Sequence, residues 1–389
     1  YPLEIIKVVM TDQCQLDQEL EKQVNHIYDL SNEYPIKVCL YELINRDNHN
    51  QFNTNITTQK NTEHYISIVI HHIAFDGWSL DIFLKELQAY YNYYLNQSQG
   101  LETNLNLPNL SIQYKDFALW QRSYLSGERL EKQLNYWKNK LSSYETLNLI
   151  TDKPRPKQID YTGRDLYFEI DEDTSAHLRE LAKELKVSLY SLLLGAYYLM
   201  LRSYSNQDDI VVGSPIANRH YNQIENLIGF FVNSLALRIT IDSKSSIKDF
   251  IQIVGHEIVE AQLHQDLPFE KLVEELNISK DTSRNPIFQV MFGVQSFGGK
   301  LYEQVNEQTE SDLTNLLQPY ATETNLYNIA KFDISTFIDD SQTKLVGSFN
   351  YRVSLYTEST MLRFTETYTE ILRQLASLTN DSQKQEQTK

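Results

Sequence analysis

The residues best suited to chemistry in this chain are two adjacent histidines, His71 and His72, which precede Asp76 and Gly77 in a short stretch. An imidazole changes charge near neutral pH, so a histidine held at a cleft can accept a proton from an attacking amine or alcohol. The same histidines can also be strand-end residues that only hydrogen-bond in place. Asp76 can orient His72, or it can brace the turn through backbone N–H groups or an arginine.

The elements around these residues predict a rigid base for them. Residues 65–70 form a β-branched and aromatic run that is typical of a strand. After the Asp-Gly turn, Leu80, Phe83, Leu84 and Leu87 recur with the spacing of one helical face. We therefore expect a strand that ends in the two histidines, a tight turn and then a helix.

The sequence gives little support for a metal site, a nucleotide-binding loop or a covalent nucleophile. Adjacent strand residues point to opposite faces, so His71 and His72 cannot easily chelate one ion, and no second His or Cys cluster has metal-ligand spacing. The 12 glycines include no G-x-G-x-x-G or Walker pattern, and no G-x-S-x-G elbow occurs. Cys14 and Cys39 lie in no reactive context. We predict that the chain binds no metal and no cofactor directly.

Length and composition limit the class of protein. A chain of 389 residues with 41% hydrophobic and 12% aromatic residues predicts a globular protein of two domains. The net charge of -17, from 52 acidic and 35 basic residues, argues against nucleic acid and against an anionic membrane as partners. Two cysteines and no signal peptide favour the cytoplasm. The most apolar helical stretch, 189–201, falls short of the roughly 20 residues of a membrane span and predicts a buried helix.

Strand-like and helix-like segments alternate through the chain, which predicts an α/β fold. Two prolines, Pro154 and Pro156, forbid a helix, and we place a lobe boundary there. The expected lobes are 1–152 and 153–378, followed by a tail at 379–389. The first lobe is expected to hold a strand at 36–44, a loop or hairpin tip at 46–61, and a helical region from 114 to 137. The second is expected to hold strands near 166–170, 210–212, 235–241, 288–294 and 345–351, and helices near 178–185, 189–201, 247–263 and 359–378.

Five ordered segments carry a resemblance to a known family. His71–Gly77 matches the HHxxxDG motif of the condensation domains of nonribosomal peptide synthetases. Four later segments resemble that family's YxDFAxW, IGxFVNT, HQDxPFE and RDxSRNP motifs: 114–120, 228–234 with Arg238 closing it, 264–270, and 281–286 with Lys280 in place of the first Arg. The family's N-terminal helix and RHExLR segment have no counterpart here. The chain therefore resembles an N-terminally incomplete condensation domain.

The resemblance implies a fold and a reaction. The fold is two chloramphenicol-acetyltransferase-like lobes in a V-shaped pseudo-dimer, with the active site in a central tunnel. An upstream donor and a downstream acceptor peptidyl carrier domain each bring a thioester on a phosphopantetheine arm, next to an adenylation domain. The acceptor amine attacks the donor thioester and a peptide bond forms. This is a step in antibiotic and other secondary metabolism, expected here in a bacterial cytoplasm.

The same resemblance assigns roles by position. His72 is the catalytic histidine, as a general base or as a stabiliser of charge. His71 supports it, Gly77 lets the chain approach the thioester closely, and Asn285 contacts substrate.

In the family the aspartate of the motif holds the loop through an arginine. For Asp76, our first candidate partner is Arg219 and our second is Arg238.

Domains with the same fold but other functions can be distinguished by the residues in and after the HHxxxDG motif. Epimerization domains share HHxxxDG but usually continue with Val-Ser-Trp-Arg, whereas residues 78–81 read Trp-Ser-Leu-Asp, which favours condensation. A heterocyclization domain would replace both histidines with aspartate. A non-catalytic recruitment domain is disfavoured by the intact His72, Asp76 and Gly77. General similarity over 224–238 favours a D-configured donor residue.

Overall fold

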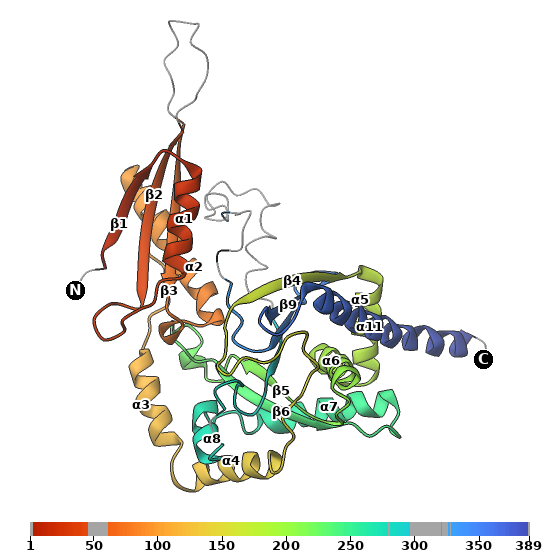
Figure 1. Ribbon diagram of the computed structural model, residues 1–389. Helices are drawn as coiled ribbons and strands as arrows, with labels where there is room; N and C mark the ends of the chain where they lie inside the picture. Colours follow the sequence, from red (N-terminus) through yellow and green to blue (C-terminus); the bar gives the residue numbers. More distant parts are fainter. Residues whose placement is uncertain are drawn as a thin grey trace, which may run out of the picture. The chain divides into compact units, whose positions relative to one another are not determined.

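The computed structural model describes residues 3–45, 61–278, 281–295, 320, 326 and 328–387 (Figure 1). Residues 46–60 of the expected loop, and Lys280, lie outside the described residues. The chain divides into two compact units: unit 1 comprises Tyr1–Asn109, Asn226–Phe230 and Gln304–Asn328, and unit 2 comprises Leu110–Glu225, Phe231–Glu303 and Ile329–Lys389. In the described part of the chain, every helix is too short or too polar to cross a membrane.

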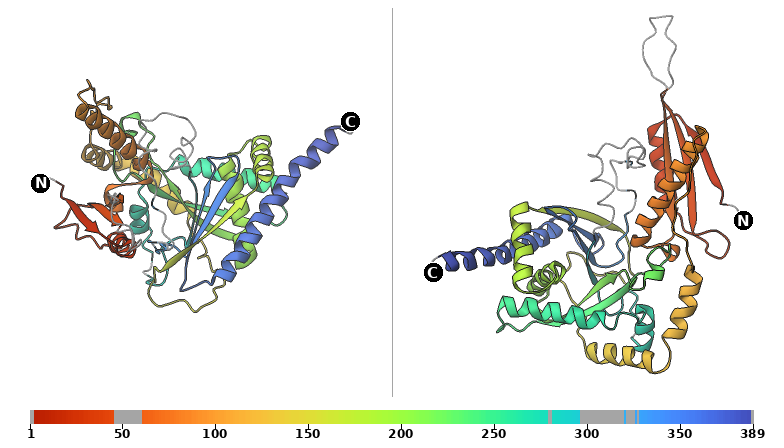
Figure 2. Two further views of the ribbon diagram at one scale, coloured as in Figure 1. Left: turned by 90° about the horizontal axis from the view of Figure 1, so that it is seen from above. Right: turned by 180° about the vertical axis from the view of Figure 1, so that it is seen from behind.

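Unit 1 is built on a three-stranded sheet in the order β1-β2-β3. Its strands are β1 (Ile5–Met10), which runs parallel to β2 (Ile36–Asn45), and β3 (Asn61–Ile70), which is antiparallel to β2. Helices α1 (Gln13–Val24) and α2 (Gly77–Ser98) lie on opposite faces of the sheet (Figures 1 and 2). A small core joins α1 to the sheet: Met10, Leu16, Leu20, Cys39, Tyr41 and Leu43. The predicted strands at 36–44 and 65–70 and the helix after the Asp-Gly turn are confirmed.

Unit 2 contains a six-stranded mixed sheet in the order β4-β9-β8-β7-β5-β6. The pairs β5–β7 and β7–β8 are parallel, and the other pairs are antiparallel. The strands are β4 (Gly163–Ile170), β5 (Asp209–Ile216), β6 (Asn233–Thr240), β7 (Val290–Val294), β8 (Ile334–Asp339) and β9 (Leu345–Arg352). All five strands expected in this region are present, and β8 is an addition to them.

The helices described in unit 2 are α3 (Tyr114–Tyr124), α4 (Gly127–Lys140), α5 (Glu172–Glu184), α6 (Leu189–Ser205), α7 (Ile247–Gln262), α8 (Phe269–Glu275) and α11 (Glu358–Gln387). All of these helices except α3 contribute residues to a large apolar core. Helix α6 is buried on almost all sides, as its apolar composition predicts, and α11 packs against α5 and α6 (Figure 2). The predicted helices are therefore confirmed.

Two expected boundaries differ from the structure. Unit 2 begins at Leu110 and not after residue 152, because α4 buries Leu134, Trp137 and Leu141 in the core of unit 2. Residues 226–230 return to unit 1, although they lie far beyond the expected boundary. The tail expected at 379–389 begins inside a helix, because α11 continues to Gln387.

Candidate active site

The two histidines lie where the sequence predicts them, between the end of β3 and the start of α2. The backbone N–H of His71 donates to the carbonyl of Pro35 at 2.8 Å, which ties the end of β3 to the start of β2. His72–Ala74 form one turn of 3-10 helix, η1, and Asp76 is the N-cap of α2. The turn is thus held by backbone hydrogen bonds at both ends.

His72 has a defined ring orientation and an exposed side chain. Its Nδ1 lies 2.6 Å from the carbonyl oxygen of Phe75. A carbonyl oxygen only accepts, so Nδ1 carries the proton of the neutral ring and Nε2 keeps its lone pair. The ring also meets Phe230 edge to face, with centroids 5.2 Å apart and an interplanar angle of 89°. His72 therefore presents a nitrogen that can accept a proton.

His71 makes different contacts. Its Nδ1 accepts a hydrogen bond from the N–H of Ile73 at 3.1 Å, which caps the start of η1. Its ring packs edge to face on Tyr28 with centroids 5.6 Å apart, and the Tyr28 hydroxyl donates to the carbonyl of Val69. Across the residues that the structure describes, no group of three or more metal-binding side chains is found.

Asp76 is buried, with 3% of its surface exposed, and it caps α2 through Ser79. Its Oδ1 accepts from the Ser79 N–H at 2.9 Å and from the Ser79 hydroxyl at 2.7 Å. Ser79 is fully buried, and its Oγ accepts from the N–H of Gly229 at 3.1 Å and lies 3.0 Å from the Gly229 carbonyl. The contacts favour the brace interpretation of Asp76. Ser79 is a functional residue that the motif did not identify, although an aspartate followed three residues later by serine is a recognisable cap pattern.

The two arginines proposed as partners of Asp76 lie in unit 2. Arg238 binds the carboxylate of Asp209 with two hydrogen bonds, which raise the pKa of Arg238, and its remaining N–H groups donate to the carbonyls of Lys140, Ser142 and Ser143. All five guanidinium N–H groups are therefore used, and the second-choice assignment of Arg238 to Asp76 is wrong.

Arg219 is the first-choice partner, and the structure places it next to an aromatic ring. Its guanidinium lies over the ring of Phe231, 4.1 Å from the centroid, and donates to the carbonyl of Ile224 at 2.8 Å. These contacts hold the chain on either side of residues 226–230. The pairing of Arg219 with Asp76 stays a prediction.

The other two predicted site residues lie in separate units. Gly77 is the first residue of α2, and its φ is not in the left-handed region. In unit 2, the Asn285 Oδ1 accepts from the buried Arg352 at 2.8 Å, and Arg352 and Arg155 both bind the carboxylate of Asp333. This network fixes the oxygen of the Asn285 amide, and the contact of Asn285 with substrate stays a prediction.

A single amide ties the motif at 228–234 to the motif at 264–270. The Asn233 Nδ2 donates to the carbonyls of Gln265 and Leu267 at 2.9 and 2.8 Å. Its Oδ1 accepts from the N–H groups of Ser234 and Phe269 at 2.9 and 3.0 Å. The amide nitrogen of this buried side chain donates twice and its oxygen accepts twice, so Asn233 has a structural role.

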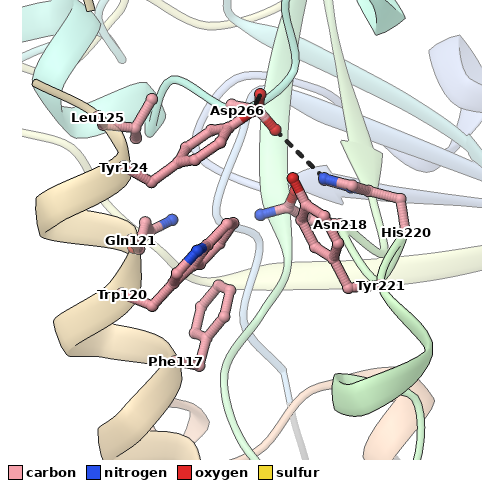
Figure 3. Close-up of a pocket in the computed structure, with 9 residues that line it drawn as sticks. All are labelled: Phe117, Trp120, Gln121, Tyr124, Leu125, Asn218, His220, Tyr221 and Asp266. Carbon is pink, nitrogen blue, oxygen red and sulfur yellow. Dashed lines mark hydrogen bonds and ion pairs between the residues drawn. The ribbon is translucent and has the colours of Figure 1, made fainter. Parts of the chain in front are cut away.

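The motif at 114–120 supplies one wall of a small aromatic pocket (Figure 3). Trp120 stacks on Tyr124 with centroids 4.6 Å apart, and His220 pairs with Asp266 at 3.3 Å. Burial, and then a hydrogen bond with Tyr124, raises the pKa of Tyr221 to about 12. The pocket is lined by Phe117, Trp120, Gln121, Tyr124, Leu125, Asn218, His220, Tyr221 and Asp266. Residues of the motifs at 114–120 and 264–270 thus lie beside the chain that precedes residues 226–230, and Asn233 binds the motif at 264–270 to the chain that follows them.

Comparison with known proteins agrees with this arrangement. The family model described as Condensation domain matches residues 1–389. N-(5-amino-5-carboxypentanoyl)-L-cysteinyl-D-valine synthase of Amycolatopsis lactamdurans is 37% identical over 375 residues, which are 96% of this chain and 9% of that protein. The synthase of the same name from the fungus Penicillium rubens is 37% identical over 93% of this chain and 9% of its own length.

A solved structure shows the same fold. A four domain nonribosomal peptide synthetase bound to AMP and glycine has a TM-score of 0.71 at 22% identity, over 96% of this chain and 27% of that one. The chain spans only about a tenth of the curated relatives it matches. With its HHxxxDG turn in place at the start of α2 and its match to the family model over the whole chain, the protein belongs to the condensation-domain family of nonribosomal peptide synthetases, whose members form amide bonds by acyl transfer.

Proposed function

We propose that this domain forms a peptide bond between two carrier-bound substrates, an aminoacyl or peptidyl thioester as donor and an aminoacyl thioester as acceptor. The observation that carries the proposal is the hydrogen bond from the His72 Nδ1 to the carbonyl of Phe75, which leaves the Nε2 lone pair for the acceptor amine. The support for His72 as the catalytic residue is its place in the motif and this tautomer.

The chemistry then needs few groups. The acceptor nitrogen attacks the donor carbonyl carbon, and the proton that the amine loses goes to the Nε2 of His72. The tetrahedral intermediate collapses with cleavage of the C–S bond, and the donor thiolate leaves and takes up that proton. Because thioester aminolysis is not intrinsically slow, orientation of two tethered substrates supplies much of the acceleration. His72 adds proton transfer or stabilisation of the charged intermediate.

The remaining roles follow the family pattern. Upstream and downstream peptidyl carrier domains deliver the substrates on phosphopantetheine arms, beside an adenylation domain, and the site binds no cofactor itself. The substrates meet in a tunnel of the two-lobed fold, where Gly77 gives the thioester room and Asn285 contacts substrate. Asp76 holds the loop from within through Ser79 and through Arg219. The donor residue is D-configured.

One experiment separates condensation from its rivals in the family. The purified domain is mixed with two carrier proteins, a donor loaded with an L- or D-aminoacyl thioester and an acceptor loaded with an aminoacyl thioester. Each carrier is followed by intact-protein mass spectrometry, and the configuration of the donor residue is read by chiral chromatography after the thioester is hydrolysed. We expect the acceptor to gain the mass of the donor residue, faster with the D-configured donor. Inversion of the donor without transfer would identify an epimerization domain. No change on either carrier would support a non-catalytic recruitment domain and would refute the proposal.

A further inference from the structure

The segment 226–230 brings an aromatic ring onto His72. Phe230 is half-buried and meets the His72 imidazole at right angles, with centroids 5.2 Å apart. The family motif does not specify this residue, because Phe230 occupies the variable position between the glycine and the phenylalanine of IGxFVNT. Sequence reasoning therefore gave Phe230 no role, and the contact is visible only in the folded unit 1.

The position of Phe230 is set by its neighbour. The N–H of Gly229 donates to the hydroxyl oxygen of Ser79 at 3.1 Å, and Ser79 is in turn bound to the buried carboxylate of Asp76. Leu227 is also buried, with 1% of its surface exposed. The backbone that carries Phe230 is therefore fixed to the first turn of α2, which follows closely on the turn η1 that presents His72.

The ring of His72 has two kinds of contact that define its orientation. The Phe75 carbonyl binds Nδ1, and the Phe230 ring packs against the imidazole. A single hydrogen bond restrains a ring less than a hydrogen bond together with an aromatic wall. Rotation of the imidazole by half a turn would replace Nδ1 with carbon at the Phe75 carbonyl and would redirect Nε2.

From these contacts we propose that Phe230 is a positioning residue for His72: it holds the imidazole in the orientation that keeps the proton on Nδ1 and the lone pair on Nε2. The proposal deepens the proposed function and rests on it where rates are concerned. Ser79 and Gly229 contribute to this positioning, because their hydrogen bond holds the backbone beside Phe230 near the turn that carries His72. Phe230 itself does not exchange a proton with substrate.

The test replaces the ring and follows both His72 and the rate. In Phe230→Leu we expect the single-turnover rate of condensation to fall about 3- to 10-fold, the range that loss of an edge-to-face pair implies. The KM for the acceptor carrier should not change. Phe230→Tyr keeps the ring and should restore the rate. In a His72→Ala background, Phe230→Leu should have no further effect, because Phe230 acts through His72.

A second measurement does not depend on activity. The ¹⁵N signals of the imidazole report which ring nitrogen carries the proton, and the His72 signals are assigned by their loss in His72→Gln. We expect His72 to be the Nδ1–H tautomer in the wild-type domain and in Phe230→Tyr, and a tautomer mixture in Phe230→Leu. Tyr94→Leu is the matched control, because Tyr94 lies on α2 with 62% of its surface exposed, and it should change neither signal nor rate.

The outcomes are distinct. A fall in rate with unchanged His72 signals would overturn the proposal and assign Phe230 to substrate binding or to folding, as would an equal loss in the His72→Ala background. Unchanged rates and signals would also overturn it. If Phe230→Leu does not fold, Phe230→Met replaces it, with an unbranched side chain of similar volume. If the wild-type domain forms no peptide bond, the proposed function fails while the ¹⁵N signals still decide whether Phe230 holds His72.

Discussion

His71 and His72 use the same ring nitrogen in opposite senses: Nδ1 of His71 accepts a hydrogen bond from the N–H of Ile73, whereas Nδ1 of His72 donates to the carbonyl of Phe75. The neutral rings are therefore opposite tautomers. His71 carries its proton on Nε2, and His72 presents a lone pair there. Two neighbouring residues of one type thus have different chemistry because different backbone groups bind them.

This difference predicts unequal effects of the same substitution. An asparagine at position 71 can still accept from the N–H of Ile73 through its Oδ1, so His71→Asn should retain most of the condensation rate. His72→Asn and His72→Ala remove the proton acceptor and should lower the rate by about 100-fold or more. Single-turnover mass spectrometry measures both. Wild-type turnover in His72→Ala would remove His72 from the mechanism.

Asp76 should contribute to stability as well as to activity. Asp76→Ala removes the cap of α2 and a partner of the buried Ser79, and we expect a loss of about 2–4 kcal/mol in the free energy of unfolding, with lower activity. Asp76→Asn keeps an acceptor for Ser79 and should recover part of the loss. Urea unfolding measures the difference. A fully stable but inactive Asp76→Ala domain would point to a direct catalytic role instead.

Asn233 gives the sharpest stability prediction in unit 2. In Asn233→Asp, a carboxylate oxygen would face the carbonyls of Gln265 and Leu267, which now accept from the amide. We expect a loss of about 3–5 kcal/mol, seen as a lower denaturation midpoint. Asn222→Asp is the control, because Asn222 is exposed, and it should leave the midpoint unchanged. Equal midpoints for the two variants would show that the Asn233 amide is dispensable.

The pH dependence of stability can be tested at Asp171, the N-cap of α5. The N–H of Thr174, and then the Thr174 hydroxyl, lower the pKa of Asp171 by binding its carboxylate. A carboxyl with a lowered pKa stabilises the fold above the unfolded pKa of about 4, and this stabilisation is lost as the pH falls through the folded pKa.

Asparagine caps a helix as well as aspartate does but does not titrate. Thermal unfolding should therefore show wild type above Asp171→Asn by about 1–3 °C at pH 6, and the difference should shrink as the pH falls below about 4 and through the folded pKa of Asp171. A difference that is constant across this range would mean that the charge of Asp171 is not involved.

Metal should not affect this site. The Nδ1 atoms of His71 and His72 are both engaged with backbone groups, so the pair cannot share an ion through these atoms. Treatment with EDTA should leave the condensation rate unchanged, and zinc should not raise the melting temperature. An ordered zinc ion on both histidines in a crystal would contradict the prediction.

Strong periodicity explains what the sequence predicted well. The apolar helix α6 and the strand, turn and helix around His72 follow from patterns within each segment. The short strands β1 and β8 were not predicted, because six residues give only a brief alternating pattern. The last turns of α11 were read as a tail, because residues after 378 lack apolar side chains although they favour helix.

For the candidate site, too, the sequence predicted the residues whose contacts are local in the chain and missed those whose contacts are distant. A motif seven residues long identified His72 and Asp76, since their roles depend on neighbours in the chain. Ser79 and Phe230 were missed, because their roles depend on each other's segments, which lie 150 positions apart at the Ser79–Gly229 contact. Arg238 was wrongly offered as a partner of Asp76, because Asp209 and three backbone carbonyls that use its guanidinium could not be inferred from its motif.

The separation of Ser79 from Gly229 also has a consequence for biosynthesis. A ribosome that adds roughly 5–20 residues per second needs roughly 8–30 s to pass from one to the other. During that interval the nascent chain carries the two histidines without the hydrogen bonds from Gly229 and without the ring of Phe230. The turn around His72 is therefore completed only after Gly229 has been synthesised, and a ribosome that stalls before residue 229 leaves it unfinished.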